Sequence, residues 1–167
     1  NTAPLSVDLD LALQRKQSQF QAGIFALNKL TDGNVHITYS EDTVSDTMLE
    51  TKGAVHHTIS GPHPAGNIGI QIHHIAPLNL KDIVWTLNAQ DVVRIGTFFL
   101  TGELDVSNIT TVVGPSIKKP AHYISRIGNE MTSIVHDNLQ DENFRLISGD
   151  VLTGNTSSME GHSHFYD

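Results

Sequence analysis

The sequence contains no cysteine in its 167 residues. Without cysteine, the chain forms no disulfide bond, offers no thiolate nucleophile and ligates no iron–sulfur cluster with its own side chains. The absence fits a protein that works in a reducing compartment such as the cytoplasm.

Basic residues and long apolar runs are also scarce. Ten Lys and Arg residues stand against 18 Asp and Glu residues, which gives a formal net charge of −8. Nucleic acid requires clustered cationic side chains, so we expect no nucleic-acid partner. The sequence has no run of about 18 apolar residues, so we expect no direct membrane span.

The two ends of the sequence predict a fragment of a longer protein. The chain starts at Asn1 rather than at Met, and it stops directly after the aromatic pair Phe165 and Tyr166. Its length still suits one domain, or two small ones with real hydrophobic cores.

The first hundred residues alternate between helical and strand-like patterns. Helices are expected at 8–30, 68–75 and 89–101, with a further short helix within 41–48, and strands at 34–40, 54–59 and 83–87. This alternation is typical of a parallel α/β sheet, but three strands are too few for a complete doubly wound domain. We therefore predict that residues 1–104 form the C-terminal half of a Rossmann-like domain whose first strands are missing. The expected buried stripes are Leu13, Phe20, Ile24 and Leu27 in the first helix, and Val92, Ile95 and Phe99 in the last.

The pattern changes after Glu103. Strands are expected at 108–113, 120–127 and 144–147, with a short helix at 130–137 whose Met131, Ile134 and Val135 point inward. Two strands, a helix and a further strand predict a β-grasp module. The fold class is therefore α/β plus α+β, with a β-grasp domain over 105–167 that is truncated at its end.

A rigid elbow separates the second expected strand from the helix that follows. Pro62 and Pro64 remove two backbone donors, and Gly61 and Gly66 permit tight turns. Isoleucines in 68–75 recur at helical spacing but also at alternate positions, so both a helix and a strand remain open. In open α/β sheets such an elbow lies at the carboxyl edge, where binding sites usually form.

The elbow does not match a nucleotide-binding motif. Gly61 and Gly66 have the spacing of a phosphate loop, but Lys and Ser or Thr do not follow the second glycine. Gly66 and Gly69 match only half of a dinucleotide fingerprint. A connection that serves packing alone is the alternative interpretation of the elbow.

Four separated motifs resemble the A subunit of the sodium-translocating NADH:quinone oxidoreductase, a bacterial respiratory complex. They extend in the same order over about residues 20–154. The motifs are His63-Pro64-Ala65-Gly66 with Ile72-His73-His74, Gln90-Asp91-Val92 through Thr101-Gly102-Glu103-Leu104, Gly114 to Pro120, and Ile147 to Gly154. The last two resemble the soluble ligand-binding β-grasp (SLBB-like) region of that protein.

The resemblance implies a peripheral subunit on the cytoplasmic face of the bacterial inner membrane. Other subunits of the complex would be its partners, and quinone is a possible ligand. The resemblance also implies no flavin or Fe–S centre in this chain, so we expect no bound cofactor, and NADH and quinone would act on the whole complex. His63, Asn67, His73 and His74 are the candidates for quinone or subunit docking, while packing around the elbow remains their alternative role.

Catalytic and metal sites receive little support from the sequence. No G-x-S-x-G motif marks a hydrolase, and the paired carboxylates Asp141 and Glu142 stand in a polar loop. Zinc needs three or four convergent ligands, and only His162 and His164 have the spacing of a pair on one strand face. We therefore expect no catalytic residue and no metal site.

A ligand titration separates three classes of function. A stand-alone nucleotide-binding enzyme binds NADH or ATP, whereas an isolated component of a larger complex binds neither. A ligand-free scaffold does not bind quinone either. We expect the isolated chain to show no NADH oxidation and no change of Trp85 fluorescence with NADH or ATP. Saturable stoichiometric binding of either nucleotide would overturn this expectation.

Overall fold

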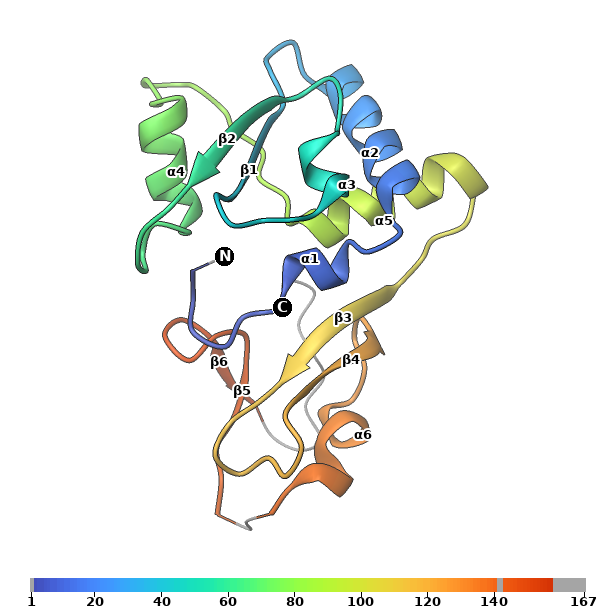
Figure 1. Cartoon of the computed structure of the whole chain (residues 1–167), viewed down its shortest axis with the longest axis vertical. Coiled ribbons are helices and arrows are strands. Elements are labelled where there is room, and N and C mark those ends of the chain that lie inside the picture. Colours follow the sequence, from blue (N-terminus) through green and yellow to red (C-terminus); the bar gives the residue numbers. More distant parts are fainter. Residues whose placement is uncertain (1, 141–142, 158–167) are drawn as a thin grey trace. The chain divides into compact units, whose positions relative to one another are not determined.

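The computed structural model describes residues 2–140 and 143–157, which form two units (Figure 1). The first contains Thr2 and residues 8–105, and the second contains residues 3–7 and 106–157. Each unit mixes helices with short two-stranded sheets, so the protein is a mixed α/β protein. No single sheet continues from 34 to 148 through the described residues.

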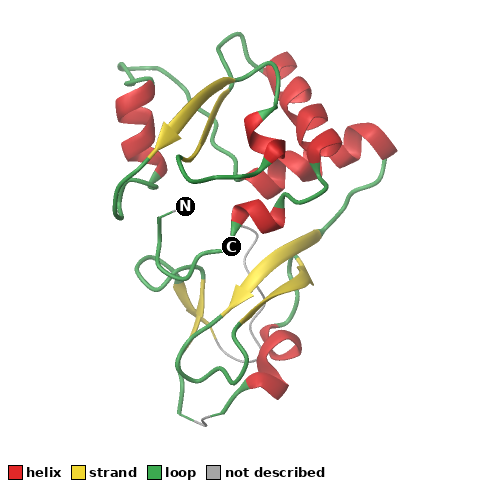
Figure 2. Ribbon diagram, in the orientation of Figure 1, coloured by secondary structure: helices red, strands yellow, loops and turns green. Residues whose placement is uncertain are grey.

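The first unit is built on a pair of parallel strands. The strands β1 (His36–Ser40) and β2 (Val55–Ile59) pair with Thr38 opposite His57. The helices of this unit are α1 (Leu9–Ala12), α2 (Gln17–Leu30), α3 (Asp46–Leu49), α4 (Ile68–Ile75) and α5 (Ala89–Thr101). Figure 2 shows these helices around the two strands. Both strands lie where the sequence predicts them.

The single helix predicted over 8–30 is wrong, because the chain breaks between α1 and α2. Arg15 takes a left-handed conformation with φ of 62°, which a continuous right-handed helix excludes. Asp8 caps α1 by accepting hydrogen bonds from the amides of Asp10 and Leu11. Leu13, in the break, is still fully buried.

One face of the strand pair carries the core of the unit. Ile37 points into a buried cluster with side chains from α2, α3 and α5. The cluster contains Leu13, Phe20, Ile24, Ile37, Met48, Val92 and Val93, and Leu27 packs against it. The inward-facing residues predicted for 8–30 are thus confirmed, although Leu13 lies in the break before α2.

Helix α5 follows its local signals but buries a different stripe from the one expected. The Asn88 side chain accepts a hydrogen bond from the Asp91 amide, and Gly102 ends the helix with φ of 75°. Val92 is buried as predicted, but Phe99 is 65% exposed. Val93 and Gly96 are buried because α5 meets α2 there.

The strand predicted at 83–87 is wrong. This stretch is an extended loop between α4 and α5, and Trp85 is 88% exposed. Its backbone makes no hydrogen bond to any described residue. The residues favour a strand, but a strand exists only where a neighbour supplies the ladder of hydrogen bonds.

The second unit contains two antiparallel pairs. Strand β3 (Ser107–Val112) pairs with β4 (Ala121–Arg126), and β5 (Leu146–Ser148) pairs with β6 (Asn155–Ser157), a strand not predicted from the sequence. Helix α6 (Met131–Val135) continues into the 3-10 helix η1 (His136–Asn138). Met131 and Val135 are buried as predicted, and Ile134 is half-buried.

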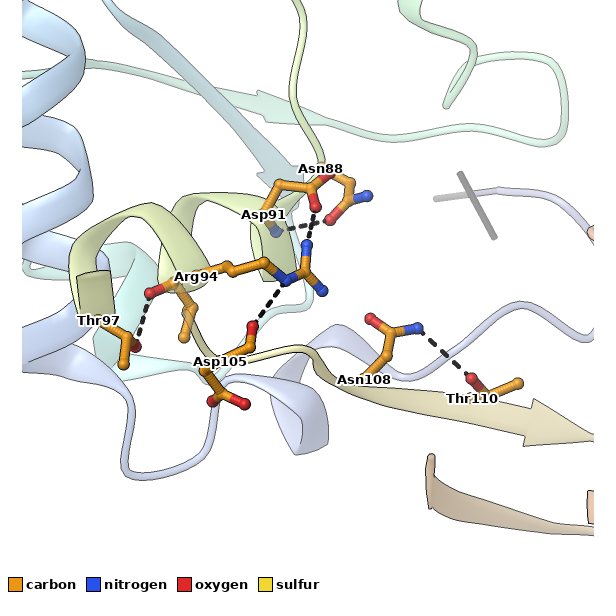
Figure 3. A network of polar contacts seen from close by, with 8 residues as sticks. Asn88, Asp91, Arg94, Thr97, Asp105, Asn108 and Thr110 are labelled. Carbon is orange, nitrogen blue, oxygen red and sulfur yellow. Dashed lines mark hydrogen bonds and ion pairs between the residues drawn. The ribbon is translucent and has the colours of Figure 1, made fainter. Parts of the chain in front are cut away.

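A polar network fastens the end of the first unit to α5. Arg94 forms an ion pair with Asp91 one turn earlier, and its Nε donates to the carbonyl oxygen of Asp105 at 3.0 Å (Figure 3). The loop after α5 is therefore held by a guanidinium that is itself positioned by a carboxylate.

Within the described residues, no helix has the length and apolar character needed to cross a membrane.

The helix contact at Gly96 predicts a sharp loss of stability on substitution. A Cβ at Gly96 would lie 1.6 Å from the Gln19 carbonyl oxygen, whereas a Cβ at Gly69 in α4 meets nothing within 4 Å. We expect Gly96→Ala to lower the free energy of unfolding by about 2–4 kcal/mol, because α2 and α5 must separate. Gly69→Ala, the control, should be neutral or stabilise by up to about 1 kcal/mol. Urea unfolding checks both; equal midpoints would contradict the close contact.

Candidate functional site

The elbow lies at the carboxyl end of β2, as the sequence predicts, and leads into α4. Two successive turns build it, in which the Ala65 amide donates to the Pro62 carbonyl at 3.0 Å and the Asn67 amide to the Pro64 carbonyl at 2.8 Å. Gly61 has φ of 116°, a conformation that residues with a side chain rarely adopt. Residues 68–75 form a helix, so the strand alternative for this stretch is wrong.

Thr2 holds the elbow from the far end of the sequence. Its hydroxyl accepts a hydrogen bond from the Gly66 amide at 2.8 Å and lies 3.4 Å from Nδ1 of His63. A Cβ at Gly66 would lie 2.5 Å from the Thr2 nitrogen, so only glycine permits this approach. His63 thus has a partner inside the unit.

Gln71 connects α4 to both the elbow and the strand pair. Its side-chain nitrogen donates to the Gly66 carbonyl at 3.0 Å, and its Oε1 accepts from the Thr38 hydroxyl at 2.8 Å. Thr38 alternates with Ile37 along β1, so α4 is tied to the face opposite the core. The sequence carries no motif that singles out Thr2, Thr38 or Gln71.

The rest of α4 is open to solvent. It has no buried residue, and Ile68 and Ile70 are 52% and 41% exposed. His73 and His74 lie in its last turn. Their rings meet edge to face at 5.3 Å, although neighbouring side chains on a helix are expected to diverge.

The four candidate residues fall into two groups. His63 lies in the elbow before α4, and Asn67 occupies the N-cap position of α4 without a capping hydrogen bond from its side chain. His73 and His74 lie at the other end of α4, and His73 is six residues, or about 9 Å, beyond Asn67 along the helix axis. The structure therefore spreads the four residues over the elbow and the length of α4 and does not gather them into one convergent site.

A second group of histidines lies on the strand pair itself. His36 and His57 stack with ring centroids 5.1 Å apart, and Nδ1 of His36 lies 2.9 Å from Nε2 of His57. His56 points to the other face, where its Nε2 donates to the Thr51 carbonyl at 2.7 Å. The alternation of side chains along the two strands would have placed His36 and His57 on one face once their register was known.

Burial lowers the pKa of His57 below its usual value of 6.5, and the neighbouring His36 and His56 lower it further. Two imidazoles that share one hydrogen bond need a donor nitrogen on one ring and an acceptor nitrogen on the other. Both rings cannot be protonated at once without the loss of this hydrogen bond.

A metal site in the described part of the chain would need a convergent set of ligands. Within it, no three His, Asp or Glu side chains converge as metal ligands. His162 and His164, and the pair Asp141 and Glu142, lie outside the described residues.

In the second unit a shallow hollow of about 490 Å³ lies between β4 and η1, lined by Lys119, Tyr123, Thr132, Ser133, Ile134, His136, Asp137 and Asn138. Asn138 bonds the Lys119 backbone and the Tyr123 hydroxyl, so part of its polar lining is already paired.

The fold and its surfaces define a two-unit mixed α/β protein with an exposed, histidine-bearing helix at the carboxyl end of a parallel strand pair. Residues 1–104 match the family described as "NqrA second alpha/beta domain", and residues 99–158 match the "NQRA C-terminal domain". The chain belongs to the NqrA family, as the sequence motifs predict.

The similar curated relatives are each described as the A subunit of a Na(+)-translocating NADH-quinone reductase. The protein of Histophilus somni strain 129Pt is 36% identical over 157 residues, which cover 94% of this chain and 35% of the relative. That of Rhodopirellula baltica is 35% identical over 159 residues, 95% of this chain and 35% of the relative. That of Serratia proteamaculans is 32% identical over 154 residues, 92% of this chain and 34% of the relative. The chain spans about a third of the length of these relatives.

The paired histidines predict a pH dependence of stability. Because the pKa of His57 is lower in the folded than in the unfolded chain, its neutral form stabilises the fold above pH 6.5. This contribution is lost as the pH falls from 6.5 through the lowered pKa, since the unfolded chain then binds the extra proton. We expect His57→Gln to flatten the decline of the urea midpoint between about pH 7.5 and 5.5.

His122→Gln is the matched control, because His122 is exposed on β4 in the second unit. It should leave the pH dependence as in the parent chain. If His57→Gln also leaves the slope unchanged, the pair does not couple protonation to folding.

Proposed function

We propose that this chain is part of the A subunit of a sodium-translocating NADH:quinone oxidoreductase. The observation that carries the proposal is the match of both units, in order, to the two NqrA families. The relatives that bear that description support it along nearly the whole chain. In this role the chain is peripheral at the cytoplasmic face of the bacterial inner membrane, with the other subunits as partners and oxidoreductase activity belonging to the assembled complex.

The proposed fold is a Rossmann-like half over 1–104 followed by an SLBB-like β-grasp domain over 105–167. Parallel β1 and β2, with α2 on the core face and α4 tied to the other, support the first assignment. The antiparallel pair β3 and β4 followed by α6 supports the second.

The proposed role of the chain is docking, without a redox centre or cofactor of its own. The sequence has no cysteine for an Fe–S cluster and no complete phosphate-loop motif for a nucleotide. Electrons then pass between NADH and quinone through centres elsewhere in the complex, and this chain supplies a surface.

The strip formed by the elbow residue His63 and by Asn67, His73 and His74 of α4 is the proposed docking surface. Asn67 and His73 are about 9 Å apart along the helix axis, which exceeds the reach of one quinone ring and favours a neighbouring subunit that lies along the helix. Exposed isoleucines between the histidines give this strip the apolar centre and polar ends of a protein interface. Quinone contact at one end is the second candidate, because an imidazole N–H can donate to a quinone carbonyl.

Replacing His63, His73 and His74 by alanine in the intact complex tests the strip. We expect weaker retention of the altered protein in the complex, or at least a tenfold loss of inhibitor or quinone affinity, since about 1.4 kcal/mol corresponds to tenfold. Quinone reductase activity, inhibitor binding and subunit stoichiometry are the measurements. Separate His63→Ala and His73→Ala/His74→Ala variants show which end acts.

His122→Ala on β4 is the matched control and should retain activity and assembly. Circular dichroism of each isolated variant confirms that it is folded. If all three measurements are unchanged in a folded triple variant, α4 serves only to connect β2 to the rest of the unit.

A further inference from the structure

Residues 83–87 have the composition of a strand but no strand beside them. Ile83, Val84, Trp85, Thr86 and Leu87 are all β-branched, aromatic or apolar, and none is charged. Ile83 and Trp85 are 83% and 88% exposed. Such a stretch exposes both its apolar side chains and its backbone donors to water, which proteins normally avoid.

Strand β1 has an open edge as well. The Val35 carbonyl and the Glu41 amide both bond to β2, and backbone groups alternate in direction along a strand. The backbone N–H and C=O groups of His36 and Thr38 therefore point away from β2. Within the described residues the backbone groups of these two residues make no hydrogen bond.

The right-handedness of parallel crossover connections predicts where a missing strand would lie in the sheet. Helices α2 and α3 both pack on the Ile37 face of the sheet. Since parallel crossovers are right-handed, the connection through α2 moves across the sheet in the same direction as the step from β1 to β2 through α3. The strand that precedes α2 would thus lie beside β1, on the side away from β2.

The connection through α4 runs the opposite way. Gln71 ties α4 to Thr38, on the other face of the sheet. A right-handed crossover on that face carries the chain back past β2 and β1 toward the open side. If residues 83–87 joined the sheet by this connection, they and the open edge of β1 would flank one strand position.

We propose that β1 and residues 83–87 receive one parallel strand between them, supplied by the same polypeptide from outside residues 1–167. The relatives are long enough to provide it, since this chain spans only 34–35% of them. The inserted strand would bond to His36 and Thr38 on one side and to 83–87 on the other, and it would cover Trp85. This inference rests on the family membership and not on the proposed docking role of α4.

Amide hydrogen exchange at single-residue resolution tests the proposal without any substitution. In the 167-residue chain, the amides of His36 and Thr38 should exchange fast, while those of Ile37 and Tyr39, which face β2, exchange slowly. In the full-length protein, we expect His36, Thr38 and alternate amides within 83–87 to slow by at least about tenfold. Ile37 and Tyr39 are the built-in control and should be slow in both.

Thiol labelling gives an independent measurement, because the parent chain has no cysteine. Trp85→Cys should react with a maleimide at least about tenfold more slowly in the full-length protein than in the 167-residue chain, with the labelled peptide identified by mass spectrometry. Leu30→Cys, 78% exposed at the end of α2, should react equally fast in both.

Three results would overturn the proposal. The first is fast exchange at His36 and Thr38, with fast labelling at position 85, in the full-length protein. The second is protection in the short chain that rises with protein concentration, which assigns the edge to a second copy. The third is protection that appears only after vesicles or quinone are added, which assigns it to a lipid surface or to the substrate.

Discussion

The close contact between α2 and α5 is the constraint on which the first unit depends. A Cβ at Gly23 would lie 2.2 Å from the Val92 carbonyl oxygen, and Gly96 meets the Gln19 backbone in the same way. Glycine at both positions lets the two backbones touch, so that Val92 and Val93 reach the cluster around Ile37. Two short strands are not stable alone, so β1 and β2 take their stability from this helix pair.

The opposite face of the strand pair is held by different means. Helix α4 buries no side chain, and polar contacts hold it, through Gln71 to Thr38 and, at the elbow, through Thr2 to Gly66. Net hydrogen bonds contribute about 1 kcal/mol each, much less than a buried apolar stripe. The core face is therefore held mainly by apolar packing, whereas the face that carries α4 and the stacked His36 and His57 is held mainly by hydrogen bonds.

Structural features that depend on a few neighbouring residues were predicted well from the sequence. Asn88 and Gly102 bound α5 as expected, because capping depends on the local backbone alone. The break at Arg15 was missed because the apolar spacing continues through it, with Leu13 still buried. Phe99 was misplaced because the contact between α2 and α5 forms at glycines, which no hydrophobic pattern records. The elbow and its helix were placed correctly, but the role of Thr2 depends on a contact 64 residues away.

The failure at 83–87 has a different cause and is the most informative. Its local preference for a strand is as strong as that of β1, yet it remains a loop in the described structure. Sequence preference states what a segment can form, while the hydrogen-bond partner decides whether it does. An incomplete sheet leaves such a segment exposed, and it also leaves a strand edge without a partner, as at His36 and Thr38 of β1. The disagreement supports the proposal that a strand from outside residues 1–167 completes the sheet, whereas the proposed docking at the elbow and α4 rests on exposed polar and apolar side chains.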